Sequence, residues 1–298
     1  MNSKIITSFL ILLLVLAIPQ VNAQTESIRE VEQKSIELTI DNEGNVSVMH
    51  QIRNSGEPRM LKFVDGTISN LEFIDGFGRY EEIDFEKGMK EMPILPNQGE
   101  FFVKYDLSDA LNLKDDVWSL DFRYLETTTF QLPEEVELVF VNQKPVLLDG
   151  KKAFACHGCE LILEYSFVEP KKLEYINWET SEFIVEIISF AEIENFEFNQ
   201  SVKEISFDVN NVNQYVTTVV PLELLWGPYA VFLNNEKIPY HEYINNGTHI
   251  WVNMKPETTG EIIIIGTTVI PEFPIIAPLA IGFLMIIVVP LIRKINLH

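Results

Sequence analysis

The sequence predicts an all-β protein built from two antiparallel β-sandwich domains. Apolar and polar residues alternate with a period of two over many short stretches, as in strands that bury one face. Gly, Asn, Asp and Pro separate these stretches at the spacing of turns. No long segment has the 3.6-residue period of an amphipathic helix. The two ends of the chain depart from this pattern, because each carries a continuous apolar run.

The N-terminal end has the three parts of a secretory signal peptide. Lys4 precedes an apolar run over residues 5–19, and small residues follow at positions 21–23. A basic start, an apolar centre and a small-residue end are the features that a signal peptidase recognises. We therefore expect residues 1–23 to form a signal-peptide helix that is cut before Gln24, so that the following chain is exported.

The first sandwich domain is expected at residues 28–168. Its strands are predicted from alternating apolar positions, which are Ile36, Leu38 and Ile40; Val46, Val48 and Ile52; Trp118, Leu120, Phe122 and Tyr124; Val136, Leu138 and Phe140; and Leu161, Leu163, Tyr165 and Phe167. The turn residues Asp41–Gly44 separate the first two strands. One short helix is expected at residues 106–111.

A second sandwich domain is expected at residues 182–267. The charged and Pro-containing stretch that begins at Glu169 marks the boundary, and residues 169–181 are predicted as a linker or as a strand that crosses between domains. Alternation then resumes at Ile205, Phe207 and Val209, at Ile250, Val252 and Met254, and over residues 262–265. Short strands with regular turns fit an immunoglobulin-like or similar sandwich in each domain.

The C-terminal end combines a short motif, an apolar span and a basic pair. The motif is Pro271, Glu272 and Phe273, the span covers residues 275–292, and the pair is Arg293 and Lys294. The span is long enough to cross a hydrocarbon core of about 30 Å. A basic pair directly after a span keeps that end on the cytoplasmic side. We therefore expect a protein secreted to the cell surface and anchored in the cytoplasmic membrane, with its N-terminal bulk outside.

This arrangement over residues 271–294 resembles the PEF or PEFG sorting signals of archaeal surface proteins. The resemblance implies recognition by an archaeosortase, a membrane transpeptidase that removes the helix and attaches a lipid, in the manner of a GPI signal. The PEFG version has Gly where this chain has Pro274. The alternative is a permanent transmembrane anchor, since membrane helices tolerate residues such as Pro278 and Pro290. Both alternatives attach the protein to the membrane.

A second resemblance covers about fifty residues before that signal. Residues 219–221, 224–229, 238–240 and 265–267 are similar to a module of secreted proteins from ammonia-oxidising archaea. This resemblance implies no activity. Within the module, Trp226 is expected either in the core, which is the usual place for a tryptophan, or as a cap over the open end of a sandwich.

The charge of the chain limits its partners. The formal net charge is −22 at pH 7, and a field of this sign repels nucleic acids and anionic lipid headgroups. Nucleic-acid binding is therefore excluded, and the charge is expected to keep the surface hydrated in saline. Sequons near predicted turns mark Asn45, Asn199 and Asn246 as expected glycosylation sites on an exported chain.

The two cysteines form a Cys156-His157-Gly158-Cys159 motif between two predicted strands. We expect a hairpin tip closed by a disulfide, because an exterior compartment favours oxidation. The alternative is a copper or zinc site that uses Cys156, His157 and Cys159, whose donor types suit Cu(I) and Zn(II). Thioredoxin-like chemistry is disfavoured because it needs the first cysteine at a helix N-terminus. His50, on an apolar strand face, is expected to be a hydrogen-bonded core residue rather than a ligand.

Catalytic motifs are missing from the sequence. It has no HExxH, GxSxG, P-loop or dinucleotide fingerprint. We therefore expect a protein that is not an enzyme and needs no cofactor, and that serves as an envelope component or as an adhesion or interaction module. One alternative is an extracytoplasmic copper- or zinc-binding or delivery protein that uses the cysteine motif. Another is an exported hydrolase with dispersed carboxylates.

Overall fold

The computed structural model describes residues 29–267 except 55, 97–98, 149 and 179–180. Over this range the protein is all-β, and its described residues contain no helix. Among them there is accordingly no helix that is long and apolar enough to cross a membrane. The predicted signal peptide at residues 1–23 and the predicted span at residues 271–294 lie outside the described residues.

The strands fall into two groups along the chain. The first strand group contains β1 (Gln33–Ile40), β2 (Val46–Ile52), β3 (Arg59–Lys62), β4 (Thr67–Asp75), β5 (Tyr80–Glu82), β6 (Glu91–Ile94), β7 (Phe101–Ser108), β8 (Leu111–Lys114), β9 (Val117–Tyr124), β10 (Thr128–Gln131), β11 (Leu138–Val141), β12 (Lys144–Leu147), β13 (Ala153–Cys156) and β14 (Cys159–Tyr165). The second strand group contains β15 (Lys171–Trp178), β16 (Ser181–Ser189), β17 (Ile193–Asn199), β18 (Glu204–Val209), β19 (Val216–Pro221), β20 (Ala230–Leu233), β21 (Glu236–Lys237), β22 (His241–Asn245), β23 (His249–Met254) and β24 (Gly260–Ile265).

The first strand group contains three sheets. A seven-stranded sheet has the order β13-β10-β1-β2-β7-β4-β5, a five-stranded sheet has the order β12-β11-β14-β9-β8, and β3 pairs with β6. The pairs are antiparallel except β1 with β10, which is parallel. This parallel pair departs from the predicted antiparallel pattern, because β10 joins the first sheet only after the chain has passed through β9 of the other sheet.

The second strand group contains two five-stranded antiparallel sheets. Their orders are β15-β16-β19-β23-β22 and β17-β18-β24-β20-β21. Each strand group has its own buried cluster of apolar side chains, so the inward-facing residues of the predicted strands pack into two separate cores. The cluster of the first group runs from Val31 to Tyr165, and that of the second runs from Ile176 to Ile264.

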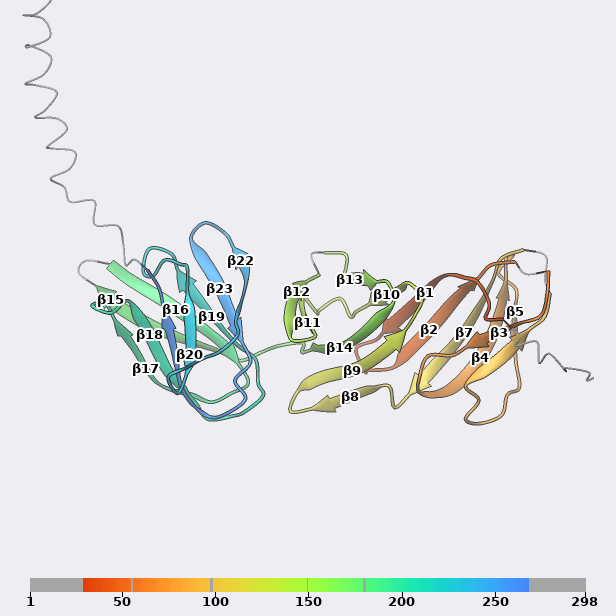
Figure 1. The fold of residues 1–298 in the computed structure, drawn as a ribbon, viewed down its shortest axis with the longest axis horizontal. Coiled ribbons are helices and arrows are strands. Elements are labelled where there is room, and N and C mark those ends of the chain that lie inside the picture. Colours follow the sequence, from red (N-terminus) through yellow and green to blue (C-terminus); the bar gives the residue numbers. More distant parts are fainter. Residues whose placement is uncertain (1–28, 55, 97–98, 149, 179–180, 268–298) are drawn as a thin grey trace, which may run out of the picture.

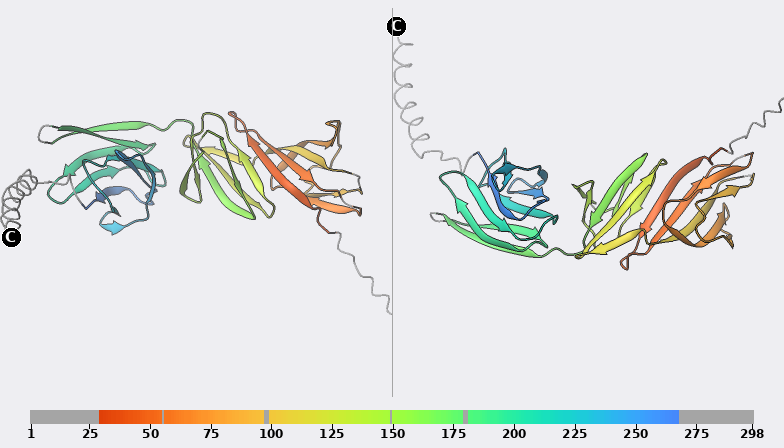
Figure 2. Two further views of the ribbon diagram at one scale, coloured as in Figure 1. Left: turned by 90° about the horizontal axis from the view of Figure 1, so that it is seen from above. Right: turned by 60° about the horizontal axis from the view of Figure 1, so that its bottom comes forward.

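The two strand groups follow each other along the long axis of the molecule (Figure 1). The first described strand, β1, belongs to the group on the right of this view, and the described chain ends in the group on the left. Two further views show the same end-to-end order (Figure 2). The described chain therefore begins in one strand group and ends in the other.

Three sequence-based assignments differ from the structure. Residues 169–181, expected as a linker or as a strand that crosses between domains, contain a strand, β15, but it pairs with β16 along its whole length and so belongs to the second strand group. β15 is an edge strand with one exposed face, so its residues look polar. The expected helix at residues 106–111 is divided between β7 and β8, because β7 is held between β2 and β4. The sequence pattern predicts Phe140 on the inward face of its strand, but Val139 is the residue that joins the core cluster.

A chain of hydrogen bonds crosses the first core. His50, which is fully buried, contacts the Gln33 side-chain oxygen through Nδ1 at 2.6 Å and the Tyr105 hydroxyl through Nε2 at 2.7 Å. Because the Gln33 oxygen only accepts, His50 Nδ1 carries the proton and Nε2 accepts from Tyr105. The Tyr105 oxygen in turn accepts from the Val64 N–H at 2.9 Å. The predicted role of His50 as a hydrogen-bonded core residue is confirmed.

The other end of the chain of hydrogen bonds reaches the adjoining sheet. Gln33 Nε2 donates to the Tyr124 hydroxyl at 3.0 Å, and that hydroxyl donates to the Lys62 carbonyl. Burial raises the pKa of Tyr124 to about 12, so the phenol keeps the proton that it donates. The Gln33 amide therefore accepts from His50 and donates to Tyr124, and the Lys62 carbonyl accepts from Tyr124, so each of these groups has a partner.

Acid should destabilise the first strand group through His50. Burial lowers the pKa of His50 to about 3, against about 6.5 in an unfolded chain. Between these values the unfolded state binds the proton first, so stability present at neutral pH is lost as the pH falls through this window. We expect about 2 kcal/mol of this loss between pH 7 and pH 5, measured by hydrogen exchange of the β1 and β2 amides after correction for intrinsic rates.

Two variants isolate this contribution. The His50→Gln variant removes the titrating ring and should lack this component of the pH dependence, although it is less stable at neutral pH. The matched variant His157→Gln changes an exposed histidine and should keep the wild-type dependence. Equal pH dependence in the wild type and in His50→Gln would show that His50 is not the titrating group.

Candidate functional site

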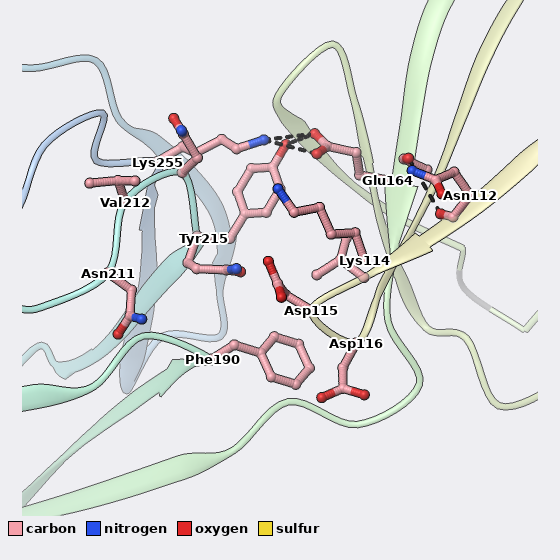
Figure 3. Close-up of a pocket in the computed structure, with 14 residues that line it drawn as sticks. Asn112, Lys114, Asp115, Asp116, Glu164, Phe190, Asn211, Val212, Tyr215 and Lys255 are labelled. Atoms are coloured by element: carbon pink, nitrogen blue, oxygen red, sulfur yellow. Dashed lines mark hydrogen bonds and ion pairs between the residues drawn. The ribbon is translucent and has the colours of Figure 1, made fainter.

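A cleft of about 670 Å³ lies where the two strand groups meet (Figure 3). The first group contributes the β8–β9 hairpin and part of β14 to its wall, and the second contributes the turn before β19 and the residue after β23. Its lining is mainly polar: Asn112, Lys114, Asp115, Asp116, Val117, Ser119 and Glu164 on one side, and Phe190, Asn211, Val212, Asn213, Gln214, Tyr215 and Lys255 on the other.

One carboxylate at this cleft binds two residues of the other strand group. Both oxygens of Glu164 lie 2.9 Å from the Lys255 Nζ, and the Tyr215 hydroxyl donates to Glu164 Oε2 at 2.5 Å. The Lys255 and Glu164 side chains are each 17% exposed, so water screens this ion pair much less than it screens the surface pairs. The contact between these three residues is called the Glu164 clamp below.

An aromatic stack lies next to the Glu164 clamp. The Phe140 and Tyr215 rings are nearly parallel, at 7°, with centroids 3.5 Å apart. Both residues are buried, yet neither belongs to the core cluster of its own strand group. The Lys255 Nζ also lies 4.4 Å from the centre of the Tyr215 ring, a cation–π distance. Burial at this stack therefore comes from the contact between the groups.

Strand register explains why these four side chains meet. Phe140 on β11 is the cross-strand partner of Glu164 on β14, so their side chains share one face of that sheet. Val216 and Met254 are partners on β19 and β23, which places Tyr215 and Lys255 opposite each other just beyond that pair. One cross-strand pair from each strand group thus meets the other, ring against ring and carboxylate against ammonium.

The electrostatics keep the Tyr215 hydroxyl protonated. Burial raises the pKa of Tyr215, and the hydrogen bond and negative charge of Glu164 raise it further. Burial also raises the pKa of Glu169, which accepts from the Ser166 hydroxyl at 3.1 Å. A phenol with a raised pKa is a stable hydrogen-bond donor. The arrangement therefore joins two surfaces, and the remaining polar side chains of the cleft stay open to solvent.

The cysteine motif connects two sheets. β13 pairs with β10 in the seven-stranded sheet, whereas β14 pairs with β9 and β11 in the other. The expected hairpin tip at His157 and Gly158 is therefore a crossover between sheets, a correction that follows from partners distant in sequence. The Cys156 and Cys159 sulfurs lie at bonding distance, with Cα atoms 5.8 Å apart, an arrangement compatible with the expected disulfide.

His157 faces a second crossover. Its Nδ1 lies 2.7 Å from the Thr127 hydroxyl, in the segment that carries the chain from β9 to β10. The two crossovers between the same two sheets are thus hydrogen-bonded to each other. Among the described residues, no group of three or more His, Cys, Asp or Glu side chains is arranged to hold a metal ion.

The remaining predicted sites lie apart from the cleft. Asn45, Asn199 and Asn246 are exposed and lie in or beside turns. Trp226 is 46% exposed, so it is not the core residue that its type favours. The motif Pro271, Glu272 and Phe273 and the pair Arg293 and Lys294 lie outside the described residues.

The sequence gives no signal for the residues of the Glu164 clamp. Glu164 and Lys255 are separated by 91 positions, and each is one charged residue among many. The alternation of apolar residues in β14 does predict that Glu164 faces away from the core. No protein-family model matches this chain, and no curated protein matches it.

Removing the shared carboxylate should separate the strand groups. In the Glu164→Ala variant the Lys255 ammonium and the Tyr215 hydroxyl lose their acceptor, which we expect to cost about 2–3 kcal/mol at this largely buried contact. Small-angle X-ray scattering should then show a wider range of molecular dimensions than the wild type. The Asp65→Ala variant breaks the exposed Lys90–Asp65 pair and should scatter like the wild type. Unchanged scattering from Glu164→Ala would contradict this role.

Loss of the cysteine pair should loosen the crossover. The closed loop is short, so replacing Cys156 and Cys159 by Ser should reduce stability by about 2 kcal/mol. Hydrogen exchange should rise first in β13 and β14. Reduction of the native protein should add the mass of two hydrogen atoms, because each sulfur gains one proton and one electron. Free thiols that bind Cu(I) or Zn(II) stoichiometrically before reduction would instead support the metal alternative.

Proposed function

We propose that this protein is a non-enzymatic cell-surface protein that serves as an envelope component or as an adhesion or interaction module. The proposal takes each strand group as an immunoglobulin-like sandwich domain, the first at residues 28–168 and the second expected at 182–267 but extended to include β15. It places a signal peptide at residues 1–23 and a membrane- or lipid-attached end at residues 271–294. Its partners are then the membrane and an unidentified component of the cell exterior.

The observation that carries the proposal is the end-to-end order of the two strand groups. The described chain starts in one group and ends in the other (Figure 1), and the Glu164 clamp joins the two groups between these ends. If the C-terminal end is held at a membrane, the first strand group is the part carried farthest from it. A protein that presents a surface at a distance from the membrane benefits from a fixed joint of this kind.

The surface chemistry also supports display outside the cell. The net charge of −22 keeps such a surface hydrated and away from anionic headgroups. The cysteine sulfurs at bonding distance fit an oxidising exterior and give less support to the copper or zinc alternative. The attachment itself follows either route expected from the sequence, as a retained helix or as a lipid added by an archaeosortase that cuts the chain near residues 268–271.

Surface display predicts accessibility to protease from outside intact cells. We expect added protease to remove the described part of the protein from cells that express the full chain, while a cytoplasmic protein in the same cells stays intact. Intact mass of the membrane-extracted protein then distinguishes the two routes of attachment. A mass that extends to His298 indicates a retained helix, and a mass that ends near Pro271 with a lipid increment indicates sorting.

The matched controls change the proposed signals alone. Charge substitution in the apolar run of residues 5–19 should keep the protein inside the cell. Replacement of Arg293 and Lys294 by Gln should leave export intact but weaken the orientation of the C-terminal end. Protection of the full-length protein in intact cells, with release only after lysis, would contradict surface display.

A further inference from the structure

The three sequons differ in what their asparagine side chains already bind. A glycan is attached through the side-chain nitrogen, Nδ2, and the enzyme that attaches it also requires the hydroxyl of the residue two positions later. A folded sequon is therefore receptive when Nδ2 is free and when the hydroxyl residue lies in an exposed turn rather than in a paired strand. The three sites can be compared by these two criteria.

Asn45 fails the first criterion. Its Nδ2 donates to Asp41 Oδ2 at 2.7 Å, and its backbone N–H donates to Asp41 Oδ1 at 2.8 Å. The oxygens of a carboxylate accept, so the atom that faces Asp41 must be the amide nitrogen. A bond to a charged acceptor is stronger than a bond between neutral groups. The nitrogen that would carry a glycan is thus held within the β1–β2 turn.

Ser47 fails the second criterion. It lies in β2, which is paired on both sides, with Thr39 of β1 as one partner and Asp106 of β7 as the other. The enzyme that attaches the glycan could bind Asn45 and Ser47 together only if the central strand β2 unfolded locally. The first sequon is therefore closed in the folded protein.

The other two asparagines meet both criteria. The Asn199 Oδ1 accepts from the Ser201 N–H at 3.1 Å and from the Ser201 hydroxyl at 2.7 Å. The Asn246 Oδ1 accepts from the Thr248 N–H at 3.0 Å and from the Thr248 hydroxyl at 2.9 Å. Because an N–H donor must face the oxygen, Nδ2 points away from the turn in each case. Among the described residues, no hydrogen bond uses either Nδ2.

Asn199 is the last residue of β17 and Asn246 follows β22, and the exposed turns that hold Ser201 and Thr248 lie near the last described residues of the second strand group. Lys203, in the turn after Asn199, donates from Nζ to the Thr267 carbonyl at 2.6 Å and accepts from the Gly266 N–H at 3.0 Å. The Thr248 carbonyl accepts from Leu222 at 2.8 Å. The turn that starts at Leu222 contains Trp226, whose carbonyl accepts from the Thr267 N–H at 2.8 Å.

We propose that Asn199 and Asn246 carry N-linked glycans, that Asn45 does not, and that the two glycans flank the exit of the chain toward its anchor. The inference rests on the proposed export, since the reaction takes place outside the cytoplasm. In each transfer the asparagine nitrogen loses a proton and bonds to the anomeric carbon of a lipid-linked oligosaccharide. The bond between that carbon and the lipid phosphate breaks, and the phosphate leaves with the electron pair.

Mass spectrometry of the full chain from the membranes of its own cells tests this. We expect two glycan increments, found on the peptides that contain Asn199 and Asn246. The variants Asn199→Gln and Asn246→Gln should each lose one of the two increments, and the matched control Asn45→Gln should lose none. The variants Ser201→Ala and Thr248→Ala give the same losses while keeping the asparagine, in case its replacement disturbs a turn.

The outcomes separate this inference from the proposed function. An increment lost in Asn45→Gln, or an unchanged mass in Asn199→Gln or Asn246→Gln, overturns the inference. A protein that is removed by external protease but carries no glycan overturns the inference and leaves surface display standing. An unmodified protein that is protected inside intact cells overturns both.

Discussion

The alignment of the two strand groups depends on one carboxylate, Glu164, which is shared by an ammonium and a phenol across their contact. Neither core cluster extends to the other, so apolar burial within each group says nothing about how the groups are oriented. An ion pair with two further restraints, a short hydrogen bond and a parallel ring stack, fixes direction as well as distance. Such a contact favours one orientation because the Phe140 ring of the first group leaves its position against the Tyr215 ring of the second if the groups rotate.

Within the first group, the chain passes between sheets at two places that support each other. The β9–β10 and β13–β14 crossovers lie side by side, joined by Thr127 and His157, and the cysteine pair lies at the second. The crossovers also account for the parallel pairing of β1 with β10, because a strand that returns from another sheet can join in either direction. The His50 hydrogen bonds tie the same sheet to the segment after β3. Polar contacts thus specify connections that apolar burial alone leaves open.

Local pattern explains what was predictable from the sequence. The β1–β2 turn, the alternation in β2 and β14 and the buried neutral state of His50 follow from residue type and period. In β11 the alternation of apolar and polar residues does not show which side chains face the core. Residues 138–141 are all apolar, because both faces of the strand are covered, one by the core and one by Tyr215. β15 is hard to recognise for the opposite reason, since its outer face is exposed and its sequence is therefore more polar. The Glu164 clamp joins residues far apart in sequence, and no short-range signal marks such a set.

The order of the two strand groups along the molecule explains how the C-terminal strand, the Glu164 clamp and the exposed turn of the first group act together. The contacts at Thr267 tie the C-terminal strand, β24, to two turns of the second group, so pulling on the chain end loads that group through its backbone. The load then reaches the first group through the Glu164 clamp and the segment that leads into β15. Exposed aromatic residues at Phe77 and Tyr80 lie in and beside the β4–β5 turn of the first group, well away from this path. A protein held at its C-terminal end would therefore keep its first group oriented while leaving that turn free to contact other surfaces.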